Sequence, residues 1–135
     1  MQSSALKIEN PADGPKPVGP YSQVAKIDLG TSYLLMVSGQ IGVDANGQLV
    51  SDSMAEQTAQ AFSNLESLLK CYGANLDAVA NIRTYLADMS KIREYGRVRL
   101  MRFGDHVPTS TTIEASHLFM PGALLEIEVT AVIPK

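Results

Sequence analysis

Hydrophobic and polar residues follow regular patterns along most of the chain, and these patterns predict five strands and two helices. Strand-like runs at residues 22–29 and 33–41, with Gly-Thr-Ser between them, predict a hairpin. Apolar residues at steps of three and four after Ser53 predict a helix that ends at Gly73. Ser53 and Glu56 have the spacing of a capping box, which marks the start of that helix. The remaining predicted elements are a strand at residues 79–86, a second helix at about 90–103, and strands near 110–114 and 124–133.

This order of elements predicts an α+β fold in which both helices cover one face of the sheet. The other face then needs polar residues or a second subunit to cover it, and the half-polar strands leave both alternatives open. Before the first predicted strand, residues 10–20 contain four prolines and two glycines, which favour a fixed, extended loop that delivers Tyr21. The length of 135 residues predicts one domain, residues 1–135.

The last predicted strand carries two carboxylates, Glu126 and Glu128, inside an otherwise apolar run. Because alternate side chains of a strand face opposite ways, both carboxylates and Thr130 share one face, and the apolar residues share the other. An unpaired buried carboxylate is costly, so the acidic face must meet water, a cation or a binding site. An ordinary solvent-exposed sheet face and a functional site are both consistent with this pattern.

The composition is that of a globular protein, with 45% hydrophobic and 19% charged residues. The net charge of −3 argues against a general electrostatic hold on nucleic acid, which needs clustered lysine and arginine. One cluster of basic residues fits the outer side of the second predicted helix, and a weak anion-binding surface is the alternative interpretation. The cluster consists of Arg93, Arg97, Arg99 and Arg102.

No apolar run approaches the roughly 18 residues needed to cross a bilayer, and the first residues lack the pattern of a secretory signal. We therefore expect a cytoplasmic protein with no membrane partner. The single cysteine, Cys71, excludes an internal disulfide and is predicted to pack in the core. His106 and His117 fall in predicted loops without acidic partners at ligand spacing, so packing or surface roles are favoured and no metal site is predicted.

The chain contains no Gly-rich phosphate loop, no HExxH, no paired CxxC and no G-x-S-x-G elbow. Four short segments remain, in this order: Gly-Pro-Tyr-Ser-Gln at residues 19–23, Val-Ser-Gly-Gln-Ile at 37–41, Pro-Thr-Ser-Thr-Thr-Ile-Glu at 108–114 and Glu-Ile-Glu at 126–128. Together with the chain length, these segments resemble the Rid family, also called RidA/YjgF. The best-known members of that family are reactive-intermediate imine deaminases.

The resemblance implies a chorismate-mutase-like α+β fold with a mixed six-stranded sheet and two helices on one face. It also implies a homotrimer with three equivalent clefts between neighbouring subunits, whose ligand is a small-molecule metabolite. Family members hydrolyse enamines and imines to ketoacids and ammonia, so no cofactor is expected. Carried over by matching segments, Tyr21 lines the cleft, Ser38 and Gly39 close its floor, and Glu126 positions water.

Three further family positions differ in this chain. The arginine that holds the substrate carboxylate falls on Ser110, a cysteine falls on Thr112, and an asparagine of the second helix falls on Gly96. A serine hydroxyl cannot reproduce the bidentate contact of a guanidinium, so substrate choice is expected to be altered. The hydroxyls of Ser110, Thr111 and Thr112, with Glu114 beside them if the strand turns it inward, favour a neutral, hydroxylated or cationic ligand. Alternatively, Arg102 or another helix arginine from a neighbouring subunit replaces the missing cation.

The resulting hypothesis is a cofactor-independent hydrolase of small imines or enamines, with Glu126 as the catalytic residue. Glu126 can act as a base if burial near Glu128 raises its pKa. The alternative is a non-catalytic trimeric protein that binds a metabolite in the same cleft. Endoribonuclease activity or translation inhibition is less favoured, because the chain is acidic and lacks an aromatic-basic strip for nucleic acid.

Overall fold

The computed structural model describes residues 4–135, which form six strands, two α-helices and two short 3-10 helices. The 3-10 helices η1 and η2 span Leu76–Ala78 and Met89–Lys91, and the α-helices α1 and α2 span Met54–Lys70 and Ile92–Phe103. The strands are β1 Leu6–Glu9, β2 Val24–Asp28, β3 Ser32–Gln40, β4 Val79–Leu86, β5 Thr109–Glu114 and β6 Leu125–Pro134.

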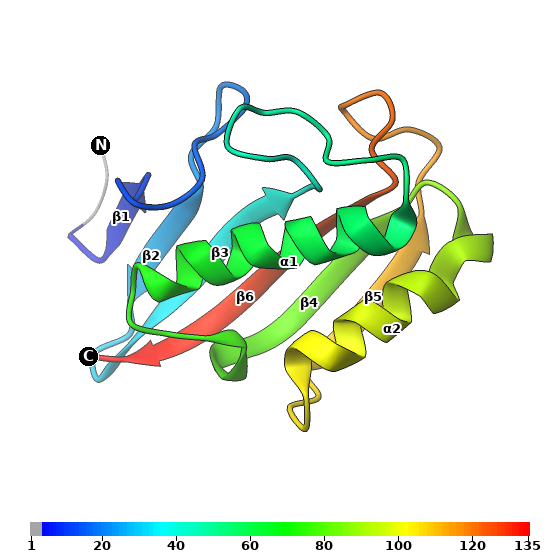
Figure 1. Ribbon diagram of the computed structural model, residues 1–135. Coiled ribbons are helices and arrows are strands. Elements are labelled where there is room, and N and C mark those ends of the chain that lie inside the picture. The colour runs from blue at the N-terminus through cyan, green and yellow to red at the C-terminus, as the bar shows by residue number, and fades with distance from the viewer. Residues whose placement is uncertain (1–3) are drawn as a thin grey trace.

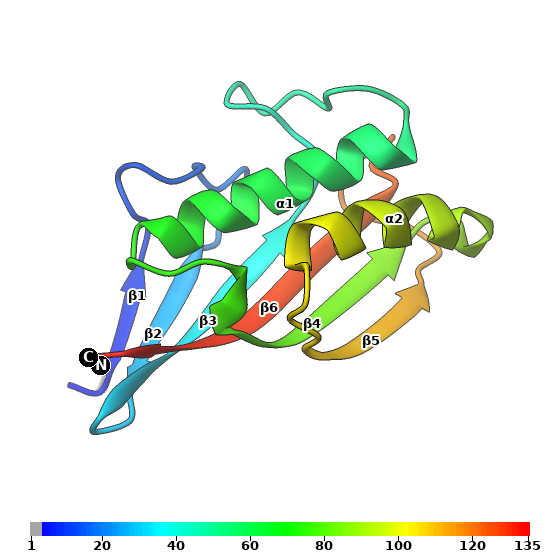
Figure 2. The same ribbon diagram turned by 60° about the horizontal axis from the view of Figure 1, so that its bottom comes forward.

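The strands form one mixed sheet in the order β1-β2-β3-β6-β4-β5, with β6 in the interior and β5 at one edge. Neighbouring strands are antiparallel except β4 and β5, which are parallel. Both α-helices lie on the same face of this sheet, as Figures 1 and 2 show from two directions. The predicted α+β fold with helices on one face is confirmed, and β1 is a strand that the hydrophobic pattern did not predict.

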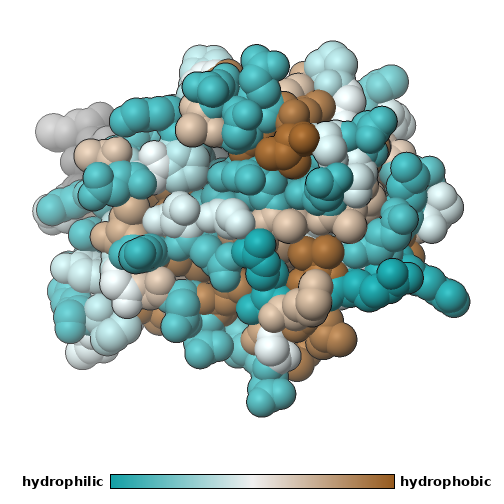
Figure 3. Space-filling view, viewed as in Figure 1, coloured by the Kyte–Doolittle hydropathy of each residue, from teal (hydrophilic) through white to brown (hydrophobic). Residues whose placement is uncertain are grey.

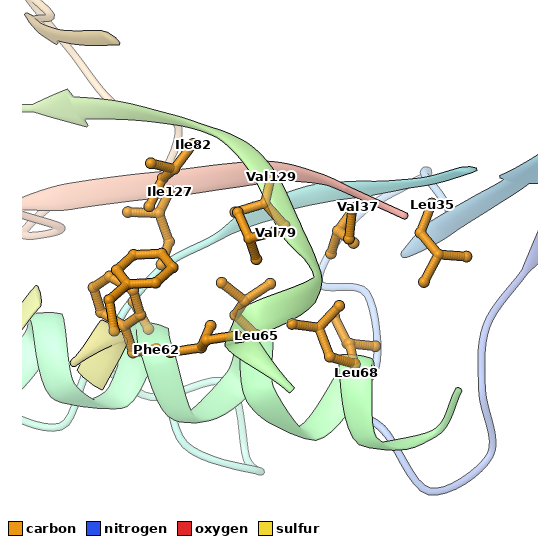
Figure 4. Packing of buried hydrophobic residues seen from close by; sticks show 14 of the residues in the cluster. Leu35, Val37, Phe62, Leu65, Leu68, Val79, Ile82, Ile127 and Val129 are labelled. Carbon is orange, nitrogen blue, oxygen red and sulfur yellow. The ribbon is translucent and has the colours of Figure 1, made fainter. Parts of the chain in front are cut away.

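The core lies between α1 and the helix-facing side of the sheet (Figure 4). Phe62, Leu65 and Leu68 of α1 point toward side chains of β3, β4 and β6, and all are almost completely shielded from solvent. Ser53 begins α1 by accepting a hydrogen bond from the backbone N–H of Glu56, 3.3 Å away. The rings of Phe62 and Phe103 meet edge to face at 5.6 Å, which ties α2 to α1.

The two sides of β6 differ as the alternation predicts. Leu125, Ile127 and Val129 are completely buried on the helix side. Glu126, Glu128 and Thr130 are half-buried on the opposite side, which no helix covers; we call it the open face. Since paired residues of adjacent strands point the same way, the open face also carries the β4 and β3 partners of these residues, Asn81, Arg83 and Tyr85 on β4 and Met36 on β3.

Two sequence-based predictions need correction. Cys71 is exposed and not part of the core, because α1 ends at Lys70 and Cys71 falls in the turn that follows. The four arginines of the second helix do not all lie on its outer side. Arg93 and Arg97 are exposed, but Arg102 pairs with Glu66 and also donates hydrogen bonds to α1 at the Ala59 carbonyl and the Ser63 hydroxyl.

The helix side of the molecule presents a mostly hydrophilic surface that hydrophobic patches interrupt (Figure 3). On and just after α2, three apolar residues are each more than two-thirds exposed, namely Leu100, Met101 and Val107. Within residues 4–135, neither helix combines the length and the apolar character that a membrane crossing requires.

Candidate active site at the end of the open face

Glu126 lies where the regular pairing of β3 with β6 breaks. The register shifts between Val37 and Gln40, and Ser38 and Gly39 form the irregular segment. A Cβ atom at Gly39 would lie 2.0 Å from Oε1 of Glu126, far inside van der Waals contact. The carboxyl group therefore rests directly on the Gly39 backbone, and only glycine leaves room for it there.

The Tyr21 loop is joined to the same irregular segment. The Ser38 hydroxyl donates to the carbonyl of Ser22 at 2.6 Å, and the Ser38 N–H donates to the carbonyl of Gln23 at 2.8 Å. The hydroxyl oxygen of Tyr21 accepts a hydrogen bond from the N–H of Val18 at 3.2 Å, and the residue is 37% exposed. These contacts hold the Pro-rich loop against the floor on which Glu126 lies.

A cavity of about 370 Å³ opens above this floor. The structure brings four predicted site residues together in it, namely Tyr21, Ser38, Gly39 and Glu126. The remaining lining residues are Val18, Gly19, Pro20 and Phe119. Phe119, in the loop between β5 and β6, lines the cavity although the sequence motifs did not predict it as a site residue. Phe119 reaches the cavity from that loop, and His117 does not line it.

The pKa values of the two open-face carboxyl groups, Glu126 and Glu128, are shifted in opposite directions. Burial, and then the negative charge of Glu128, raise the pKa of Glu126 above its ordinary value. Burial alone would raise the pKa of Glu128 as well, but hydrogen bonds from Tyr85 at 2.5 Å and Arg83 at 3.1 Å outweigh it and lower the pKa. Glu128 is therefore a stable anion, whereas Glu126 accepts a proton more readily.

The carboxyl oxygens of Glu126 are free to bind a ligand. Within residues 4–135, no side chain or backbone N–H donates a hydrogen bond to them. A half-buried carboxylate with a raised pKa that faces a cavity can hold a water molecule and take a proton from it.

The β5 residues lie elsewhere. Ser110 and Thr112 pair with Ile82 and Thr84, so they face the helix side, whereas Thr111 pairs with Arg83 and faces the open side. The Glu114 carboxylate accepts the N–H of Met89 at 2.9 Å and caps the short helix η2. None of the four lines the cavity of Glu126 in the same chain. They lie at the outer strand of the sheet, where a neighbouring molecule can reach them.

The family profile described as Endoribonuclease L-PSP matches residues 11–133. The chain belongs to this family, which is also known as the YjgF, RutC or Rid family. The match covers both α-helices, strands β2 to β5, and all but one terminal residue of the Pro-rich loop and of β6. The resemblance seen in the four short segments is thereby confirmed.

Named Rid-family relatives align over most of their lengths. The human 2-iminobutanoate/2-iminopropanoate deaminase is 31% identical over 133 residues, which are 98% of this chain and 93% of that protein. A RutC family protein of Pyrococcus horikoshii is 33% identical over 120 residues, 88% of this chain and 91% of its own length. The crystal structure of the Rid protein YyfA from Yersinia pestis has a TM-score of 0.83 at 29% identity and covers 94% of this chain and 98% of that one.

Two other features of this Rid-family chain bear on the site. A larger cavity, of about 470 Å³, shares Val18, Tyr21 and Gly39 with the Glu126 cavity, but Glu126 does not line it. Its buried amides, Gln23, Gln40 and Asn64, are already hydrogen-bonded to protein atoms. Within the described part of the chain, no three His, Cys, Asp or Glu side chains are arranged to hold a metal ion.

Proposed function

We propose that this chain is a cofactor-independent hydrolase of small imines or enamines, which yields a carbonyl compound and ammonia. The single observation that carries the proposal is the Glu126 carboxyl group, which faces a cavity without a hydrogen-bond partner among the described residues and has a raised pKa. The human relative is named as a deaminase of 2-iminobutanoate and 2-iminopropanoate, and this supports the same reaction type.

The proposed mechanism needs one water molecule and one proton acceptor. Glu126 removes a proton from water as its oxygen attacks the electrophilic carbon of the C=N bond, which forms a carbinolamine. Glu126 passes this proton to the nitrogen, and the proton of the new hydroxyl group follows through the same carboxyl group as the C–N bond breaks, so that NH3 leaves and the carbonyl forms. The Tyr21 hydroxyl and the polar groups of Ser38 and Gly39 lie at the same cavity and are the groups proposed to orient the substrate.

We further propose that the protein is a homotrimer in which copies cover one another's open faces. Exposed apolar side chains on that face, among them Ile8, Met36 and Val132, support burial against other copies. The cleft would then combine the Glu126 cavity of one copy with the β5 edge of the next. Light scattering on a sizing column should give a mass of about 43 kDa, three times the 14.5 kDa of one chain; a mass near 14.5 kDa would exclude the shared cleft.

The activity is tested by generating imines in situ from a panel of amino acids with an amino-acid oxidase. Ketoacid and ammonia should appear faster with the protein than with buffer or with an equal amount of albumin. Semicarbazide traps imines chemically and therefore competes with the protein for them. Less semicarbazone should form when the protein is present, which tests the activity independently. No acceleration for any amino acid in a broad panel would reject the deaminase function.

A second candidate is a non-catalytic protein that binds a metabolite in the same cavity. The observation that favours it is the departure of Ser110, Thr112 and Gly96 from the pattern of the deaminases that the chain resembles. A metabolite that raises the Tm of the protein and is recovered unchanged would support binding without turnover. Endoribonuclease activity, which the family description names, has less support because the net charge is −3. A cytoplasmic location stays a prediction.

A further inference from the structure

The guanidinium group of Arg99 lies directly beside Ser110, across the gap between α2 and β5. Its Nη1 donates hydrogen bonds to the Ser110 hydroxyl at 2.9 Å and to the Tyr95 hydroxyl at 3.2 Å. Tyr95 is itself buried and shares a 2.5 Å hydrogen bond with Thr84 of β4. The cation is therefore held in place from both sides and does not swing freely in solvent.

The contacts of Arg99 leave its charge and its best binding edge unused. Both of its hydrogen-bond partners are neutral hydroxyls, and no carboxylate among residues 4–135 lies within salt-bridge distance. Only Nη1 is engaged, so Nε–H and the Nη2–H pair have no partner in that part of the chain. These N–H groups lie side by side in the arrangement that binds a carboxylate through two parallel hydrogen bonds.

The surroundings of Arg99 strengthen the attraction between its guanidinium group and an anion. Arg99 lines a cavity of about 390 Å³ whose walls include Ile92, Phe103 and Val107. Its guanidinium carbon lies 5.8 Å from the centre of the Phe103 ring, close enough for a cation–π contact. An apolar wall lowers the local dielectric constant, so an anion that enters is attracted more strongly than at an open surface. At Gly96, on the same wall, an added Cβ would meet no atom within 4 Å, which leaves the mouth of the cavity wide.

Arg102, the other arginine considered from the sequence, has no such freedom. Its Nη1 is paired with Glu66, and its Nη2 donates to the Ala59 carbonyl at 3.1 Å and the Ser63 hydroxyl at 3.2 Å. Its charge is neutralised and its donors are engaged in holding α2 to α1. Arg99 is therefore the arginine that remains available beside Ser110.

We propose that Arg99 is the substrate-binding cation of this chain, and that it holds the carboxylate of a small 2-imino acid in place of an arginine at position 110. This inference rests on the proposed function for the class of substrate. The proposal requires a trimer in which the β5 edge of one copy brings Arg99 to the Glu126 cavity of the next, so that one subunit binds the carboxylate and the other hydrolyses the imine carbon. The ligand is then an anion, not the neutral or cationic compound that the serine and threonine hydroxyls alone favour.

The test measures binding of 2-oxobutanoate, a ketoacid that is not consumed, and of its neutral amide to the purified full-length protein by calorimetry. The wild type should bind the acid at least tenfold more tightly than the amide. Arg99→Met should weaken binding of the acid by about 10- to 100-fold and leave the amide unchanged, as expected for loss of one charge-assisted bidentate contact. Arg99→Lys should bind the acid with an affinity between those of the wild type and Arg99→Met, because an ammonium group supplies the charge but not two parallel hydrogen bonds.

Two further variants guard against a trivial loss of folding. Arg97→Met removes an exposed arginine from the same helix and should bind like the wild type. Adding Ser110→Arg to Arg99→Met returns a guanidinium to β5 and should restore binding of the acid. Equal binding of the acid by the wild type and Arg99→Met, or equal binding of acid and amide by the wild type, would overturn the role of Arg99.

The same variants separate this inference from the proposed activity. If the wild type hydrolyses imines and Arg99→Met raises the KM with little change in kcat, both proposals are supported. If hydrolysis is unaffected by Arg99→Met, the deaminase function stands and the role of Arg99 fails. If the wild type does not hydrolyse imines but loses ketoacid binding on Arg99→Met, Arg99 is a carboxylate-binding residue and the deaminase function fails.

Discussion

Glu126 and Glu128 lie two residues apart on the same face of β6, yet they differ in their hydrogen-bond partners and in their access to a cavity. Glu128 lies in the regular part of the sheet and is held by Arg83 and Tyr85 of the neighbouring strand. Glu126 lies against the irregular segment of β3, where Gly39 gives it room and a cavity begins. Regular strand pairing supplies an acid with partners, whereas a break in the pairing leaves an acid free to react.

The largest expected difference between the two is in activity. Replacing Glu126 by Gln removes the proposed proton acceptor and should lower kcat/KM for imine hydrolysis by about 10²- to 10⁴-fold. Replacing Glu128 by Gln should lower it by less than about tenfold, because that carboxylate has no direct contact with the cavity. The coupled oxidase assay measures both, and equal losses in the two variants would contradict the division of roles.

Gly39→Ala should cause the next largest loss of activity, because the added methyl group would displace the Glu126 carboxyl group. A misplacement of about 1 Å is expected to lower kcat/KM by roughly 10²-fold. The comparison is made in a double-mutant cycle with Glu126→Ala. Adding Gly39→Ala to that variant should cause little further loss, and a full additional loss would mean that Gly39 acts independently of Glu126.

The contribution of the Arg83–Glu128 ion pair to stability is tested with Arg83→Met. The ion pair between Arg83 and Glu128 is about 30% exposed on both sides, so its coupling is expected to be only about 0.5–1 kcal/mol. Urea unfolding of Arg83→Met, Glu128→Gln and the double variant gives this coupling energy directly. A coupling of zero would show that Tyr85 alone is sufficient to hold Glu128.

The smallest expected effect is a gain in stability. Because the pKa of Glu126 is raised in the folded protein, folding favours its protonated form, and its ionised form is disfavoured at neutral pH. This contribution is fully present below the ordinary pKa of about 4.5 and is lost as the pH rises through the raised value. Glu126→Gln should therefore have a higher Tm than the wild type at pH 7, and the gain should disappear toward pH 4. A lower Tm at pH 7 would contradict the direction of the shift.

Elements with strong periodicity were predictable from the sequence. The strand expected at residues 79–86 is β4, Val79–Leu86, with Ile82 and Thr84 on the core side as the alternation requires. Strand β1 was missed because four residues before a Pro-rich loop carry too little pattern to identify a strand. Its pairing with β2 supplies the order that the local sequence lacks.

The candidate site was predictable in part. Tyr21, Gly39 and Glu126 were identified from short motifs, and the structure places them around one cavity. Arg99 could not be chosen among the helix arginines, because its role depends on the register of β5 and on the distance between α2 and that strand. Glu114 was grouped with the cleft for the same reason, since nothing local shows that its carboxylate caps η2.

The contact between Gly39 and Glu126 also constrains how this sequence can change over time. A side chain at position 39 would force the end of the flexible Glu126 side chain out of its present place, so it would take the acid away from the cavity floor without removing it from the sequence. The two positions are therefore expected to change together, because a side chain at position 39 leaves the carboxyl group of position 126 no place on the cavity floor.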